Sequence, residues 1–186
     1  MRSNAKKTTE RHDHDTQRSP HQLSQAESRI LERIQAIAFD APGVLPAARG
    51  LSHFGEHAAG WMASAGLGAA VDKQRRGQWL RVGASALSAH AASVVIKRIV
   101  RRRRPDYPYV RVGVSTPSKL SFPSSHSTST AAFCTGVSEM TGSRAPLAGI
   151  PVMMASRMVL GVHYPTDTLL GSMIGYAIAK RMMGRS

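Results

Sequence analysis

Residues 156–167 read SRMVLGVHYPTD. An apolar run rich in Ala and Met precedes this stretch, and a second apolar run follows it. Pro165 favours the first turn of a helix, because its fixed φ suits that position and its missing N–H is not needed there. The stretch therefore predicts the end of one helix and the start of the next, with Arg157, His163 and Asp167 near the junction.

Weakly apolar segments rich in Ala, Gly, Ser and Met run through the rest of the chain. They cover residues 54–71, 79–96, 128–140, 145–160 and 166–179. Most are shorter than the ~20 residues that cross a bilayer comfortably. Small residues let helices approach closely within a membrane, and basic clusters separate several of the segments. The pattern predicts an all-α fold, a transmembrane bundle of about five to six short helices, with a soluble helical bundle as the alternative.

Upstream of these segments, apolar residues recur at helical spacing across residues 30–38, with charged residues between them. This amphipathic run predicts a helix that lies on the membrane surface or forms a poor first span, ending near Pro42 and Gly43. Residues 1–25 are polar and have no apolar core, so we expect a disordered basic tail there. The length of 186 residues suits a single domain, which we place at residues 26–186.

The chain is strongly basic, with 25 Lys and Arg against 11 Asp and Glu and a formal net charge of +14. Such a charge favours anionic partners: phospholipid headgroups, phosphorylated substrates or nucleic acid. The single cysteine, Cys134, excludes an internal disulfide and a cysteine-based zinc site. No cluster of His, Asp, Glu and Cys indicates a metal cage, so we expect neither a metal nor another cofactor.

Three segments concentrate residues that suit a phosphate group. Residues 97–105 predict a helix that ends in basic side chains and is stopped by Pro105. Residues 123–128 read PSSHST and predict a proline turn followed by a helix start, whose free backbone N–H groups attract anions. The third segment is residues 156–167. If successive helices alternate in direction, all three segments converge on one face of the bundle, which would lie at one face of the membrane.

A phosphate held at this face would have Lys97, Arg104 and Arg157 as cationic ligands. Ser124, Ser125 and the helix N–H groups would be neutral donors. Donors fixed in place in this way stabilise the charge of a five-coordinate phosphorus transition state. Each segment alone is a weak signal, and it is their joint spacing that indicates a site for phosphate chemistry.

Two histidines and one carboxylate have matching roles in such a site. A neutral imidazole can attack phosphorus, and a carboxylate bonded to its other nitrogen orients the ring and sets its tautomer. His163 with Asp167 fits this description. His126 would protonate the leaving oxygen and then activate the water that hydrolyses the phosphohistidine.

The spacing of these residues resembles the three motifs of the type-two phosphatidic acid phosphatase superfamily. The matching positions are Lys97 with Arg104-Pro105, then Pro123-Ser124-Ser125-His126, and then Ser156-Arg157 with His163 and Asp167. The resemblance extends over about residues 51–179 and leaves out the N-terminal tail. Its departure is Ser125, where the family usually has glycine; the backbone N–H remains, and the side chain adds bulk and another donor.

The resemblance implies a helical core, usually membrane-spanning, that hydrolyses phosphomonoesters or diphosphates through a phosphohistidine without a metal. The short length, basic tail and Arg-rich first motif are similar to those of compact actinobacterial members linked to polyprenyl phosphates of the cell wall. One such substrate is decaprenylphosphoryl-5-phosphoribose, a precursor of an arabinose donor. We therefore expect an integral, multi-pass lipid phosphate phosphatase in the plasma membrane of a bacterium.

Two enzymatic alternatives use the same residues: a phosphatidate phosphatase and a polyprenyl diphosphate phosphatase. The non-enzymatic alternative is a basic protein that binds a membrane or nucleic acid through its tail and residues 101–104. That alternative gives no account of the spacing between His163 and Asp167, so we do not expect nucleic acid as a partner. Basic clusters at both ends of the bundle leave its orientation in the membrane open.

Overall fold

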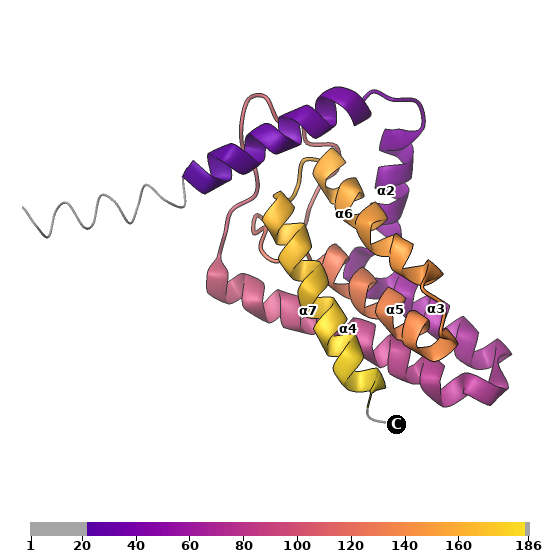
Figure 1. Ribbon diagram of the computed structural model, residues 1–186. Helices are drawn as coiled ribbons and strands as arrows, with labels where there is room; N and C mark the ends of the chain where they lie inside the picture. The colour runs from indigo at the N-terminus through magenta and orange to yellow at the C-terminus, as the bar shows by residue number, and fades with distance from the viewer. Residues whose placement is uncertain (1–21, 185–186) are drawn as a thin grey trace, which may run out of the picture.

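A computed structural model describes residues 22–184, and these residues are mainly helical (Figure 1). The first helix covers residues 22–38. The helices that follow are α2 (Val44–Phe54), α3 (Ala59–Val71), α4 (Arg76–Val100), α5 (Ser125–Thr141), α6 (Gly149–Val159) and α7 (Pro165–Met183). The short 3₁₀ turns η1 (Glu56–Ala58), η2 (Lys73–Arg75) and η3 (Ala145–Ala148) precede α3, α4 and α6. Within residues 22–184 the chain forms no strand, only an isolated bridge, so the all-α prediction is confirmed.

The apolar segments expected from the sequence correspond to α3 through α7. The expected count of about five to six helices is too low, because the first helix and α2 form as separate elements on either side of a turn at residues 39–43. Of the tail expected at residues 1–25, residues 1–21 lie outside the described residues, and residues 22–25 belong to the first helix.

Helix α5 is central to the bundle and packs against α4, α6 and α7, while α3 packs along α4. Figure 1 shows the first helix, in indigo, crossing the end of the bundle at which α7 begins and α6 ends. The first helix is attached there by its buried face: Leu31 packs in one cluster with Tyr164, and the side-chain amide of Gln35 donates to the carbonyl oxygen of Val159 at 2.9 Å.

Small residues allow α5 and α7 to approach closely. A Cβ at Gly175 would lie 2.0 Å from the carbonyl oxygen of Thr128, a distance that no side chain tolerates. Gly171 and Gly175 form a G-x-x-x-G pattern, which is common where membrane helices meet. A buried cluster of alanines from α4, α5 and α7 continues this interior, so the helices are held by close backbone approach rather than by large apolar side chains.

Larger apolar side chains point away from the bundle. They include Leu80, Leu87, Val95, Ile99, Leu169, Leu170, Met173 and Tyr176. In the part of the chain that the structure describes, one helix, Lys73–Val100, is long and apolar enough to cross a membrane by length and composition. Small residues inside and large apolar residues outside are typical of helices that pack in lipid, where the interior need not be more apolar than the surroundings.

The connection between α4 and α5, residues 101–124, contains no helix, as its prolines predict. Its two arms are joined by a hydrogen bond from the backbone N–H of Ser121 to the carbonyl oxygen of Arg102, at 2.7 Å. The turn between α6 and α7 packs against this loop: Gly161 has a φ of +67°, and a Cβ there would lie 2.2 Å from the carbonyl oxygen of Arg111. Loop and turn together bring the three phosphate-compatible segments to one end of the bundle.

Candidate active site

A cavity of about 300 Å³ lies where α4 ends, α5 begins and α6 turns into α7. Side chains from all three phosphate-compatible segments line it: Lys97, Arg104, Ser125, His126, Arg157 and His163. Ser124 and Asp167 do not line the cavity, and both are fully buried. The three segments, distant in sequence, therefore meet in one site.

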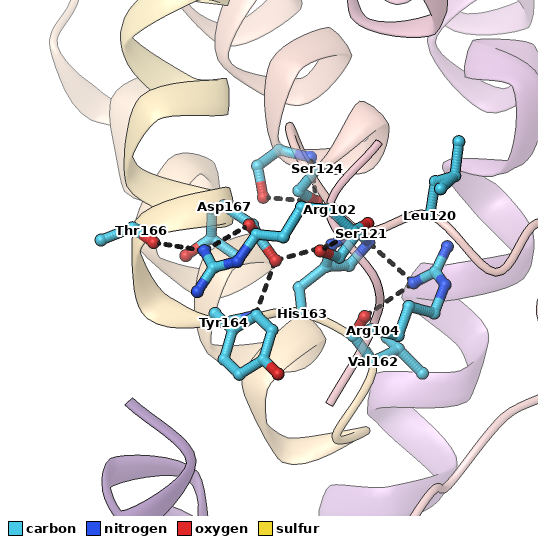
Figure 2. Close-up of polar contacts among 12 residues, drawn as sticks. Arg102, Arg104, Leu120, Ser121, Ser124, Val162, His163, Tyr164, Thr166 and Asp167 are labelled. Carbon is cyan, nitrogen blue, oxygen red and sulfur yellow. Dashed lines mark hydrogen bonds and ion pairs between the residues drawn. The ribbon is translucent and has the colours of Figure 1, made fainter. Parts of the chain in front are cut away.

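Arg104 contacts the histidine that the sequence predicts as the nucleophile (Figure 2). Its Nη1 donates to the carbonyl oxygen of Val162 at 2.7 Å and lies 3.1 Å from Nε2 of His163. Because a guanidinium only donates hydrogen bonds, Nε2 must accept, which leaves the ring proton of a neutral His163 on Nδ1. Burial lowers the pKa of Arg104 to about 10, so the guanidinium keeps its charge at neutral pH.

His163 is almost completely buried, with 1% of its surface exposed. Burial and the positive charges of Arg104, Arg157 and Lys97 hold the pKa of His163 well below its ordinary value, so the ring is neutral. Its Nδ1 lies 3.7 Å from Oδ2 of Asp167. That distance is longer than a hydrogen bond. His163 and Asp167 are therefore neighbours, as expected from the sequence, but they are not hydrogen-bonded to each other.

Both carboxylate oxygens of Asp167 accept hydrogen bonds from other groups (Figure 2). Oδ2 accepts the backbone N–H of Tyr164 at 2.9 Å, which also caps the start of α7. Oδ1 accepts Nη1 of Arg102 at 2.9 Å. These contacts fix the carboxylate on the Nδ1 side of the His163 ring.

Ser52, near the end of α2, contacts two of the expected site residues. Its carbonyl oxygen lies 2.9 Å from Nε2 of His126, and its hydroxyl accepts Nη1 of Arg157 at 2.7 Å. A carbonyl oxygen cannot donate, so His126 carries a proton on Nε2. Acid–base exchange at His126 is therefore left to Nδ1.

The cations of the cavity are positioned without carboxylate partners. Arg157 is 1% exposed, and its Nε has no hydrogen-bond partner. Lys97 is 9% exposed, and its Nζ donates to the carbonyl oxygen of Leu120 at 3.4 Å. In residues 22–184, the salt bridges include neither of these side chains nor Arg104. Buried positive charges without a counter-ion favour an anion bound between them.

The two serines expected to bind phosphate have different positions. The hydroxyl of Ser124 accepts the backbone N–H of Ser127 at 3.4 Å, so it caps α5 instead of facing the cavity. Ser125 lines the cavity, and its hydroxyl lies 2.8 Å from that of Ser93 in α4. The side chain at the family's glycine position is thus accommodated by a polar contact with α4.

A second polar group lines the same cavity. It consists of His53, Glu56, His57 and His90. Every histidine in residues 22–184 therefore lines this one cavity. The rings of His57 and His90 have centroids 6.0 Å apart, and Nδ1 of His90 is buried without a hydrogen-bond partner. This polar group can form hydrogen bonds with parts of a substrate other than its phosphate.

Arg102 and Ser52 contact the site, although the sequence analysis does not single them out. Arg102 belongs to a run of four arginines that is typical of a membrane anchor, yet its side chain is only 19% exposed and pairs with Asp167. Ser52 is 74 residues from His126, and Arg102 is 65 residues from Asp167. No local pattern could have found contacts at such separations.

Comparison with known proteins agrees with the motif resemblance. The sequence profile of the PAP2 superfamily matches residues 78–184, more than half of the chain. The chain belongs to the PAP2 superfamily. This PAP2 chain is 54% identical over 145 residues to the decaprenylphosphoryl-5-phosphoribose phosphatase of Mycolicibacterium smegmatis, a match that covers 78% of the chain and 81% of the relative. A protein of the same name from Mycobacterium tuberculosis is 49% identical over 149 residues, covering 80% and 84%.

A solved PAP2 structure has the same fold. It is the crystal structure of a transmembrane PAP2 type phosphatidylglycerolphosphate phosphatase from Bacillus subtilis, with a TM-score of 0.70 and 21% sequence identity. The likeness covers 87% of this chain and 85% of that one. Ser52 lines the cavity and precedes the matched PAP2 segment, so part of the wall around the cavity comes from outside that segment.

Proposed function

We propose that this chain is an integral membrane phosphatase that removes the terminal phosphate of decaprenylphosphoryl-5-phosphoribose through a phosphohistidine. The observation that carries the proposal is a set of cations without a counter-ion around the neutral ring of His163: Lys97 and Arg157, which are buried, and Arg104, which is partly buried. The names and the sequence identity of the mycobacterial relatives support the choice of substrate.

In the first step, Nε2 of His163 attacks phosphorus, and the bond between phosphorus and the ribose oxygen breaks. Burial and the positive charges of Arg157, Arg104 and Lys97 lower the pKa of His126 to about 3 in the empty site, so the proton must arrive with the bound phosphate ester. His126 then gives a proton from Nδ1 to the departing oxygen, because its Nε2–H is hydrogen-bonded to Ser52. Arg104 must move from Nε2 of His163 to a phosphate oxygen before the attack. Asp167 then stabilises the positive charge that develops on the phosphorylated ring, through its position beside Nδ1.

In the second step, water attacks the phosphohistidine. Neutral His126 accepts the proton of the water at Nδ1 while the N–P bond breaks and its electron pair returns to Nε2 of His163. Inorganic phosphate leaves, and the site regains its starting protonation after the alcohol and the phosphate have gone. Lys97, Arg104 and Arg157 stabilise the five-coordinate phosphorus of both steps.

The second polar group of the cavity supports a sugar phosphate over a diacylglycerol phosphate. A ribose next to the transferred phosphate carries two hydroxyls, and these match hydrogen-bonding groups such as Glu56, His57 and His90. Phosphatidate and polyprenyl diphosphate offer no hydroxyl at that position, so these two alternatives would leave the buried Nδ1 of His90 without a partner.

A substrate panel tests the proposed function. We expect the purified protein, in detergent with EDTA, to release phosphate from prenylphosphoryl-5-phosphoribose with a kcat/KM about 10-fold or more above that for phosphatidate or polyprenyl diphosphate, because only the first offers hydroxyls to the second polar group of the cavity. Vanadate should inhibit, since it can occupy the site as a five-coordinate oxyanion. Preference for phosphatidate, or activity that returns only with a divalent ion, would contradict the proposal.

We also propose that the protein is an integral, multi-pass protein of a bacterial plasma membrane. The large apolar side chains on the outside of α4 and α7 support this, as does the transmembrane description of the Bacillus subtilis structure. Residues 26–186 would form the membrane-embedded phosphatase domain, together with residues 22–25, which belong to the first helix. The expected basic tail would precede that helix.

A membrane fractionation measures the mode of attachment. The protein should remain in the membrane pellet after washing with high salt or alkali and should be released by detergent, because lipid rather than charge holds its outer surface. Release by salt alone would mean that basic residues supply the attachment and would favour the non-enzymatic alternative, a basic membrane-binding protein.

A further inference from the structure

An ion pair links the first helix to the carboxylate behind the candidate nucleophile. Glu27 of the first helix is 4% exposed, and its Oε2 accepts Nη2 of Arg102. Nη1 of the same guanidinium donates to Oδ1 of Asp167 at 2.9 Å. Arg102 therefore contacts two buried carboxylates, one from the first helix and one from α7.

The contacts around this ion pair leave Arg102 little freedom (Figure 2). Thr166 accepts Nη1 of Arg102 at 2.8 Å through its hydroxyl. The backbone N–H and the hydroxyl of Thr166 both donate to Oε1 of Glu27, at 2.9 and 2.7 Å. The guanidinium carbon also lies 3.9 Å from the centroid of the Tyr164 ring. The start of α7, the loop after α4 and the first helix are thus joined at one point.

We propose that Arg102, held by Glu27, is a positioning residue that fixes Asp167 beside Nδ1 of His163. The inference rests on the proposed phosphohistidine chemistry of His163. Asp167 has two oxygens: the backbone N–H of Tyr164 holds one and Arg102 holds the other. The side chain of Ser121 also hydrogen-bonds this carboxylate. Loss of Arg102 would remove the charged partner of a buried carboxylate and loosen its position, and a carboxylate moved by about 1 Å can cost roughly 100-fold in rate.

The first helix therefore contributes to the site without contacting the substrate. Glu27 precedes the matched PAP2 segment at residues 78–184, and it does not line the cavity. Its carboxylate neutralises the charge of Arg102 and supplies the acceptors that orient the guanidinium. Without Glu27, Arg102 could turn from Asp167 toward solvent, because the arginine side chain is long and partly exposed.

Kinetics of two single variants make the first test. Arg102→Gln and Glu27→Gln should lower the rate of phosphoenzyme formation from p-nitrophenyl phosphate by about 10- to 100-fold, with little change in KM, because neither residue touches substrate. Glu32→Gln is the matched control: Glu32 is on the same helix and pairs with exposed Arg29, so it should behave like the unaltered protein. An effect of Glu27→Gln no larger than that of Glu32→Gln would overturn the proposal.

A double-mutant cycle separates positioning from a merely structural role. Once Asp167→Asn has removed the carboxylate, adding Arg102→Gln should lower the rate by less than about twofold, since the residue through which Arg102 acts is gone. Equal losses in both backgrounds would mean that Arg102 supports the fold, and thermal unfolding in detergent would then show the same additive loss. The assay measures the phosphoenzyme formed from p-nitrophenyl phosphate, so its result does not depend on which lipid is the natural substrate. Absence of any phosphoenzyme in the unaltered protein would instead refute the proposed function itself.

Discussion

His163→Ala should abolish turnover and remove any acid-labile phosphoenzyme. Nε2 of His163 accepts a hydrogen bond from Arg104, so this nitrogen carries a lone pair that can attack phosphorus. His126 cannot replace it at Nε2, because that nitrogen is bonded to Ser52. Loss of a covalent nucleophile costs on the order of 10⁶ in kcat, so turnover should fall to the small residual rate that the cations of the cavity still support.

Rapid-quench trapping with labelled substrate measures this result directly. The unaltered protein should show a phosphorylated species that is stable to alkali and labile to acid, and His163→Ala should show none. Asp167→Asn serves as the comparison, because it keeps Nε2 of His163 and changes only the group beside Nδ1. It should form the phosphoenzyme slowly. A normal burst in His163→Ala would assign the attack to another residue.

His126→Ala should fail in a different way, because it removes a proton donor and leaves the nucleophile. Hydrolysis of an ester with a poor alkoxide leaving group should slow by about 10²–10⁴-fold, the usual scale of general acid–base catalysis. With p-nitrophenyl phosphate, whose leaving group needs little protonation, phosphoenzyme formation should suffer much less. The second step still needs a base, so the intermediate should accumulate.

The ratio of rates for the two esters is the decisive measurement for His126. It should rise strongly in favour of the activated ester in His126→Ala, while Ser52→Ala, which keeps the carbonyl oxygen that His126 contacts, should leave that ratio near its original value. A phosphoenzyme trapped in His163→Ala but not in His126→Ala would reverse the two assignments.

The helices and the three phosphate-compatible segments could be predicted because their signals are local. Pro123 precedes α5 and Pro165 opens α7, as their fixed φ angles require. The prediction that Pro105 stops the preceding helix is wrong, because α4 already ends at Val100, where Arg101 adopts a left-handed conformation. The roles expected for these segments also follow from residue chemistry alone. Their convergence needed one further assumption, alternating helix directions, and the cavity brings together side chains from all three.

The contacts that orient the site could not be predicted from one sequence. Ser52, Glu27 and Arg102 act through hydrogen bonds to residues distant in the chain, and a partly buried Arg102 is indistinguishable in sequence from the exposed arginines beside it. The hydroxyl of Ser124 was expected to face phosphate, but an N-cap position competes for that oxygen. The hydropathy pattern was weak because small residues, which are only weakly apolar, fill the interior of the bundle. In residues 22–184, only the helix at Lys73–Val100 has a long apolar run.

The contact between Arg104 and His163 also bears on how the last product leaves. After the alcohol has diffused away, inorganic phosphate remains among three cations, and the attraction that captured the substrate now retains the product. In the empty site Arg104 regains a partner, Nε2 of His163, at 3.1 Å. That recovered hydrogen bond offsets part of the interaction lost when phosphate departs. The nucleophile is thus also the group that competes with phosphate for the arginine, which favours release and returns the site to its resting arrangement.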